Sequence, residues 1–122
     1  PELWDRSFFP RLEEIRGRIS QNEFFGVCDN YDPVSGVFEY VAGVAVKPGS
    51  PVPRGMVSWE IPENTYAVFP TVLDEIKETI ERICKEWLPS LGIETVDAPM
   101  FEYYDEDFLD GQKLYVYVPV VN

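Results

Sequence analysis

The sequence contains no histidine, and its two cysteines, Cys28 and Cys84, lie far apart without a Cys-x-x-Cys pair. The missing histidine excludes a Cys–His nucleophile, and without histidine or paired cysteines only carboxylates remain as metal ligands, so we expect no metal and no cofactor. The two cysteines are compatible with one disulfide, but we favour two buried free thiols in a reducing cytosol, and hence a cytoplasmic protein. Long apolar runs and a signal-peptide pattern are also missing, so we expect no membrane partner.

Basic residues are scarce, with 10 Lys and Arg against 22 Asp and Glu and a formal net charge of −12. A nucleic-acid surface needs basic clusters, so direct binding of nucleic acid by this chain is not expected. The charge fits cationic ligands, or simply solubility. With 122 residues, of which 45% are hydrophobic and 15% aromatic, one domain over 1–122 is expected. The start at Pro1 without Met indicates processing or a piece of a longer protein.

The stretch from Met100 to Asp105 reads as a short strand because it is dense in aromatic residues and free of breakers. Alternation places Met100, Glu102 and Tyr104 on one face and Phe101 and Tyr103 on the other. A carboxylate between two apolar neighbours is costly in a sealed core and ordinary on an open surface. The third reading is an aromatic cavity with one acid, an arrangement that holds a cation.

Apolar periodicity predicts helices over residues 3–19 and 71–88, with Pro10 as an awkward residue in the first. Strands are expected over residues 24–28, 37–46, 55–61, 65–69 and 112–121, and turn-rich loops over 29–36 and 47–51. In the last strand the aliphatic row of Leu114, Val116, Val118 and Val120 suits burial under helices, while Tyr115 and Tyr117 lie on the other side.

An internal duplication is visible, in which each of two similar units follows a helix. The first unit contains Phe25-Gly26, a loop, and then Gly36 and Tyr40. The second unit contains the matching series Phe101-Glu102, a loop, and then Gly111 and Tyr115. This alignment pairs Tyr40 with Tyr115 and predicts that both lie on an aromatic face away from the helices. The strand over 65–69 precedes the second helix, and we expect its counterpart to lie before Pro1 or to be absent.

Six segments in order carry a family resemblance: Leu3-Trp4…Phe9-Pro10-Arg11-Leu12, Tyr40…Gly43, Ile61-Pro62…Tyr66-Ala67-Val68-Phe69, Trp87-Leu88-Pro89, Phe101-Glu102-Tyr103-Tyr104-Asp105 and Tyr117-Val118-Pro119-Val120. Together they resemble the GyrI-like effector-binding domain of AraC-type and MerR-type multidrug-responsive transcription regulators. The resemblance implies an α+β fold of pseudo-twofold duplicated βαββ units, an antiparallel sheet with two helices packed on one face. It also implies a small-molecule pocket at the junction, aromatic and holding an acid that falls, by motif, on Glu102. The chain departs from the family in its missing first strand, and it contains no DNA-binding helix pair.

The expected ligand-binding residues surround Glu102, whose counterpart in the first unit, Gly26, leaves space for a ligand on the pseudo-symmetry axis. The other candidates are aromatic, and core packing is the alternative for several of them: Tyr104, Tyr40, Trp59, Tyr66, Tyr115, Phe25, Phe9 and Trp87.

Three functions fit this set of residues. The leading one is sensing of a cationic or amphipathic aromatic ligand, without catalysis, with a DNA-binding domain attached in a longer protein. The second is hydrolysis of reactive cyclopropane-containing toxins, with Glu102 as general base and Tyr104 or Tyr40 orienting a water. The third is a protein-interaction module of gyrase-inhibitor type.

Overall fold

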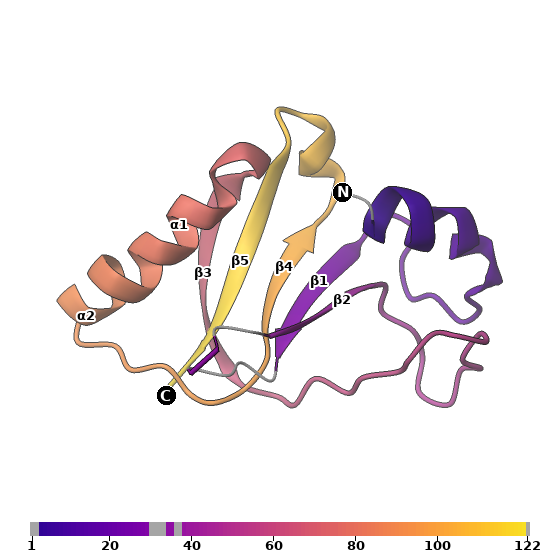
Figure 1. Ribbon diagram of the computed structural model, residues 1–122, viewed down its shortest axis with the longest axis horizontal. Helices are drawn as coiled ribbons and strands as arrows, with labels where there is room; N and C mark the ends of the chain where they lie inside the picture. Colours follow the sequence, from indigo (N-terminus) through magenta and orange to yellow (C-terminus); the bar gives the residue numbers. More distant parts are fainter. Residues whose placement is uncertain (1–2, 30–33, 36–37, 122) are drawn as a thin grey trace.

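Five antiparallel strands form one sheet in the computed structural model, which describes residues 3–29, 34–35 and 38–121 (Figure 1). The strands are β1 (Phe24–Asp29), β2 (Glu39–Gly43), β3 (Thr65–Val72), β4 (Met100–Tyr104) and β5 (Lys113–Val120). Their order across the sheet is β2-β1-β4-β5-β3. The expected α+β fold with an antiparallel sheet is confirmed.

Two helical rods accompany the sheet, one at each end of the view in Figure 1. The N-terminal rod consists of η1 (Leu3–Phe8) and the 3₁₀ segment η2 (Phe9–Glu14). It ends five residues earlier than expected. The second rod runs through η3 (Leu73–Glu75), α1 (Ile76–Arg82), η4 (Ile83–Trp87) and α2 (Leu88–Ser90). A short 3₁₀ helix, η5 (Glu106–Leu109), connects β4 and β5.

Local chemistry explains where the rods depart from the prediction. Pro10 lies in the first turn of η2, where its missing N–H breaks the regular ladder between the two N-terminal segments. The second rod begins at Leu73 rather than Thr71, because β3 keeps pairing with β5 as far as Val72. Thr71 therefore belongs to the strand, where its hydroxyl bonds that of Thr79 at 2.7 Å.

The core lies between the second rod and one face of β5. Val116, Val118 and Val120 pack with Ile83 and Leu88, and all five are buried. Side chains alternate along a strand, so the tyrosines of β5 lie on the opposite face, where Tyr117 stacks on Phe101 with ring centroids 4.6 Å apart. The predicted aliphatic and aromatic sides of β5 are confirmed.

The segment between β2 and β3 is irregular. No strand forms over residues 55–61, although their alternation predicted one, and β2 is shorter than the expected 37–46. Proline at 48, 51 and 53 removes backbone donors between the end of β2 and residue 55, which disfavours ladder pairing there. Of the predicted loop over residues 29–36, residues 30–33 and 36 lie outside the described part of the chain.

The register across the sheet corrects the predicted position of Tyr40. Tyr40 pairs with Cys28, and Cys28 pairs with Met100. Residues opposite each other in neighbouring strands point to the same face, so Tyr40 lies on the face of Met100 and Glu102, the helix face. The placement of Tyr40 beside Tyr115 was wrong, because spacing from a glycine across loops of unequal length does not fix register.

Candidate functional site

Glu102 lies in β4 with a residue exposure of 9%, on the sheet face that carries the helices. Tyr40 and Tyr104 each donate a hydroxyl hydrogen bond of 2.9 Å to its Oε1 atom. Trp4 of the N-terminal rod donates its indole N–H to the Tyr40 hydroxyl at 3.1 Å. The surface reading of Glu102 is therefore wrong, and the buried acid belongs to a partly buried chain of hydrogen bonds that runs from helix to sheet.

Three strands place these groups next to one another. Glu102 and Tyr104 are two residues apart on β4 and so share a face, while Tyr40 reaches across from β2. Between them, Gly26 of β1 pairs with Glu102 in register. A Cβ atom at Gly26 would lie 2.6 Å from Oε1 of Glu102 and against the Tyr40 hydroxyl, so only glycine leaves room for this chain of bonds.

The N-terminal rod covers the site with aromatic rings. The Trp4 ring lies edge-on to Tyr104, with centroids 5.7 Å apart, and also contacts Phe8 and Phe9. Trp4 is the site residue that sequence reasoning missed. Its place in the apolar stripe of the helix indicated core packing, and nothing in the local sequence distinguishes an indole that packs from one that also donates.

Burial and the charge of Glu102 together shift the pKa values of the neighbouring groups. Burial, followed by the negative charge of Glu102, raises the pKa of both Tyr40 and Tyr104 above the ordinary tyrosine value. The same two causes raise the pKa of the Cys28 thiol to about 12. The two tyrosines therefore stay protonated as hydrogen-bond donors at neutral pH. Cys28 and Cys84 are both free thiols as expected, but the expected burial was wrong, because Cys84 is exposed and Cys28 only partly buried.

Basic side chains do not neutralise Glu102 within the described residues. The salt bridges seen there join Arg11 to Glu14 and Lys113 to Asp110, both on the surface. The site thus presents one carboxylate, two hydroxyl donors and an aromatic wall.

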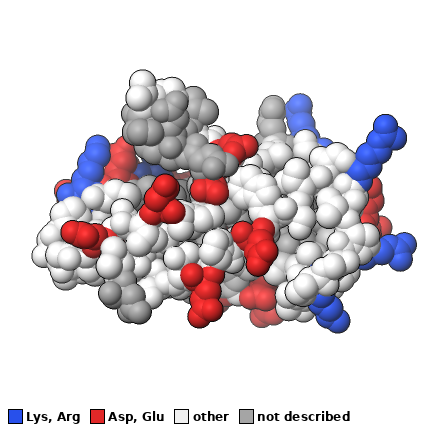
Figure 2. Space-filling model, turned by 90° about the horizontal axis from the view of Figure 1, so that it is seen from below, with Lys and Arg blue, Asp and Glu red and all other residues white. Residues whose placement is uncertain are grey.

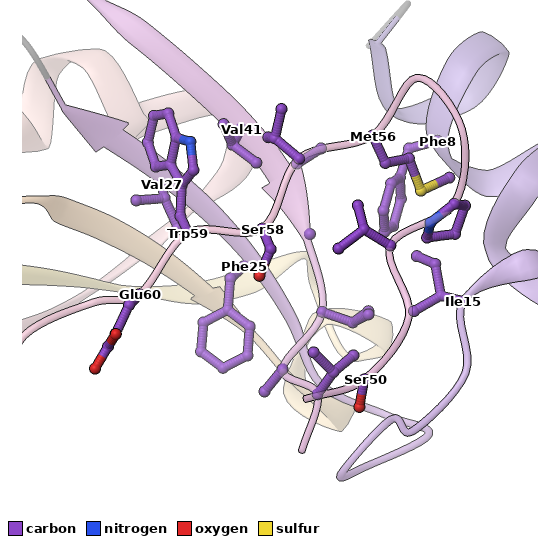
Figure 3. A pocket seen from close by; sticks show the side chains of 18 of the residues that line it. Phe8, Ile15, Phe25, Val27, Val41, Ser50, Met56, Ser58, Trp59 and Glu60 are labelled. Carbon is purple, nitrogen blue, oxygen red and sulfur yellow. The ribbon is translucent and has the colours of Figure 1, made fainter. Parts of the chain in front are cut away.

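The remaining predicted site residues lie apart from Glu102. Tyr66, Tyr115 and Phe25 point to the opposite face of the sheet, where Tyr66 and Phe25 both contact Phe101. Trp87 stacks on Phe69 at the end of the second rod. Trp59 belongs to the irregular segment after β2, beside Val41 in Figure 3. Phe9 is connected to the site through its ring contact with Trp4.

The α+β fold, with its five-stranded antiparallel sheet and two helical rods, is that of an effector-binding domain. The chain belongs to the family described as integron-associated effector binding protein (Cass2), whose model matches residues 1–120. It is 37% identical over 125 residues to the transcriptional regulator BrlR of Pseudomonas aeruginosa. That match covers 98% of this chain and 45% of the regulator, so the chain spans less than half the length of this relative. The resemblance to the effector-binding domain of transcription regulators is confirmed.

The helical segments that the structure describes are all too short or too polar to cross a membrane.

Proposed function

We propose that this chain binds a small cationic or amphipathic aromatic ligand at Glu102, as the sensing domain of a multidrug-responsive transcription regulator or as a stand-alone cytoplasmic drug-binding protein. One observation carries the proposal. Glu102 is a buried carboxylate whose hydrogen bonds come from tyrosine hydroxyls, and the described residues provide it with no cationic partner.

A buried carboxylate without a cation is unfavourable, because its hydration is lost and hydroxyl donors replace only part of it. A ligand with a delocalised positive charge supplies the missing countercharge. Trp4 and Tyr104, which contact each other edge to face beside the acid, are the aromatic partners we propose for this charge, and each cation–π contact contributes about 0.5–2 kcal/mol. Neutral or anionic ligands of the same shape gain the stacking but not the ion pairing, so the site selects cations.

The charge of the whole chain acts in the same direction. Figure 2 shows acidic side chains over the middle of the underside, with Lys and Arg side chains at the margins. Together with the net charge of −12, this surface raises the local concentration of cations and speeds their encounter.

The relative suggests how the bound state is used. BrlR is a transcriptional regulator more than twice as long as this chain. In a protein of that kind, a ligand shifts the equilibrium of an attached DNA-binding domain only if it favours one conformation over the other. We propose that Glu102 is the point at which the ligand acts.

The test is a thermal shift with two ions of matched shape, tetraphenylphosphonium and tetraphenylborate. A ligand that binds only the folded state stabilises it by RT ln(1 + [L]/Kd), about 2.7 kcal/mol at one hundred times Kd. We expect the cation to raise the melting temperature and the borate to leave it unchanged. Equal shifts from both ions would refute the selection by charge.

Hydrolysis is the second candidate, because both tyrosines bond the Oε1 atom and no donor among the described side chains reaches Oε2. Oε2 is therefore available to accept a proton from a water as general base. Incubation with a cyclopropane-containing electrophile, followed by mass spectrometry, distinguishes the two functions: a sensor returns the compound unchanged, whereas a hydrolase adds one water per turnover.

A further inference from the structure

The sheet face opposite Glu102 carries a group of aromatic side chains that neither helical rod covers. Both rods pack on the other face, the first against Tyr40 and the second against the valines of β5. Strand register arranges the opposite face in two rows that cross β4, β5 and β3. One row is Tyr103, Tyr115 and Pro70, and the other is Phe101, Tyr117 and Val68. We call these six residues the tyrosine face.

The rings of the tyrosine face pack on one another and remain partly exposed. Phe101 is buried at the centre, where it stacks on Tyr117 with ring centroids 4.6 Å apart. Tyr103 and Tyr115 are partly exposed, and Val68 is 46% exposed. A contiguous surface with this much exposed apolar and aromatic area is typical of a protein interaction site.

Two tyrosines of this face are hydrogen-bonded to carboxylates. Tyr103 donates its hydroxyl to Glu23, and Tyr115 donates its hydroxyl to Oδ2 of Asp107 at 2.6 Å. Because each carboxylate stabilises the protonated hydroxyl, the pKa of both tyrosines is raised. Asp105 lies beside them and accepts the backbone N–H of Asp107 at 2.9 Å. The rim of the tyrosine face therefore presents negative charge and hydrogen-bond acceptors.

Basic side chains of the described residues do not form salt bridges with these three carboxylates. The salt bridges found there join Arg11 to Glu14 and Lys113 to Asp110. Lys113 lies two residues before Tyr115 on β5, but its Nζ atom lies 3.4 Å from Asp110. The charge at the rim is therefore available to a partner molecule.

We propose that the tyrosine face is a docking surface for an extended basic segment of another protein, with Arg or Lys at alternate positions. Charge complementarity selects this partner over a second copy of the chain, because two copies would each bring a net charge of −12 and place carboxylates against carboxylates. A basic segment instead lays its cationic side chains on the tyrosine rings and pairs them with the acids, and arginine is well suited to both contacts.

The spacing of the rings determines the spacing of the basic residues. The ring centroids of Tyr103 and Tyr115 lie 6.4 Å apart, and each ring has a carboxylate at its hydroxyl. In an extended chain, side chains two residues apart lie on the same side at a separation of about 6.8 Å. Alternate basic residues can therefore each meet one tyrosine–carboxylate pair, whereas contiguous ones point to opposite sides.

The width of the face limits the size of the partner. β4 and β3 lie on either side of β5, so they are about 10 Å apart at about 4.8 Å between neighbouring strands. This width accommodates one peptide segment and is small for the interface of a whole domain.

The test measures binding of a short synthetic peptide in which Arg and Ser alternate, labelled for fluorescence anisotropy. One control peptide carries citrulline in place of arginine, which keeps the shape and removes the charge. A second control peptide has the same composition with its arginines contiguous. The protein variant is Glu23→Gln/Asp107→Asn, which keeps an acceptor for both tyrosine hydroxyls. Its matched control, Glu94→Gln/Asp97→Asn, removes the same charge from exposed positions elsewhere.

We expect the alternating arginine peptide to bind more tightly than both control peptides. Glu23→Gln/Asp107→Asn should weaken its binding about fivefold, the effect of two exposed ion pairs. The control Glu94→Gln/Asp97→Asn should change it less than about twofold. A second variant, Tyr115→Leu, keeps the acids and removes one ring, and should weaken binding by about two- to fivefold.

Three results would overturn the proposal. Equal binding of the arginine and citrulline peptides, or of the alternating and contiguous peptides, would remove the argument from charge and spacing. Equal losses in the two double variants would mean that only the net charge of the chain attracts the peptide. A dimer of the chain in sedimentation that Tyr115→Leu abolishes would mean that a second copy covers the tyrosine face.

Discussion

Replacing Glu102 by Gln tests the site most directly, because the change removes the charge while keeping the shape and an acceptor for the two tyrosine hydroxyls. Glu102 is only 9% exposed, so water screens its charge weakly. With a charge separation of about 6 Å and an effective dielectric constant of about 20, the ion pair with a hydrophobic cation is worth about 2.8 kcal/mol. That energy corresponds to about a hundredfold change in Kd.

Isothermal titration with tetraphenylphosphonium should therefore show a Kd about a hundredfold weaker for Glu102→Gln than for the unmodified chain. A neutral aromatic compound should lose much less. The matched control is Glu94→Gln, which also removes one negative charge but from an exposed position, and should change Kd less than twofold. If Glu102→Gln and Glu94→Gln weakened the cation equally, Glu102 would act only through net charge and the binding site would lie elsewhere.

Two further predictions concern the same cluster. Gly26→Ala places a methyl group against Oε1 of Glu102 and the Tyr40 hydroxyl. We therefore expect the free energy of unfolding, measured in urea, to fall by about 1–3 kcal/mol, together with weaker cation binding. A change within about 0.5 kcal/mol, the size of a neutral surface substitution, would contradict the packing. The pKa values of Tyr40 and Tyr104 are raised, so the folded state holds these two protons more tightly than the unfolded chain does. The resulting stabilisation of the folded state is complete below the unfolded pKa of about 10 and is lost as pH rises through the folded pKa values. Above about pH 10, the free energy of unfolding should fall more steeply with pH in the original chain than in the double variant Tyr40→Phe/Tyr104→Phe. The difference in slope is at most about 1.4 kcal/mol per pH unit for each tyrosine. Equal slopes of stability against pH in the two proteins would show that neither hydroxyl is held by Glu102.

Much of the strand pattern could be read from the sequence because alternation is a local property. It placed Glu102 with Met100 and Tyr104, and it separated the valines of β5 from Tyr115 and Tyr117; the structure confirms both. The correspondence of Gly26 with Glu102 was also right, and the two residues pair directly.

Expectations that depended on register or on loop chemistry were less successful. Tyr40 was placed on the wrong face, and the alternation over residues 55–61 predicted a strand that does not form. Of the eight predicted aromatic residues, the structure brings Tyr40 and Tyr104 into hydrogen bonding with Glu102. Local sequence gives each aromatic ring a preference for burial, but which rings share a site depends on which strands become neighbours.

By itself, the sequence determined the fold class and the duplicated architecture and pointed to Glu102 as the candidate acid, because periodicity, composition and ordered motifs are written along the chain. Only the tertiary structure decided that Glu102 is buried, that Trp4 and Tyr40 connect it to the N-terminal rod, and that Gly26 leaves the space for this connection. It also showed that, among the described strands, β2 lies at one edge of the sheet and β3, paired with β5, at the other. The physical reason is that these contacts join residues on separate elements, and their geometry follows from strand register, which local propensity does not encode.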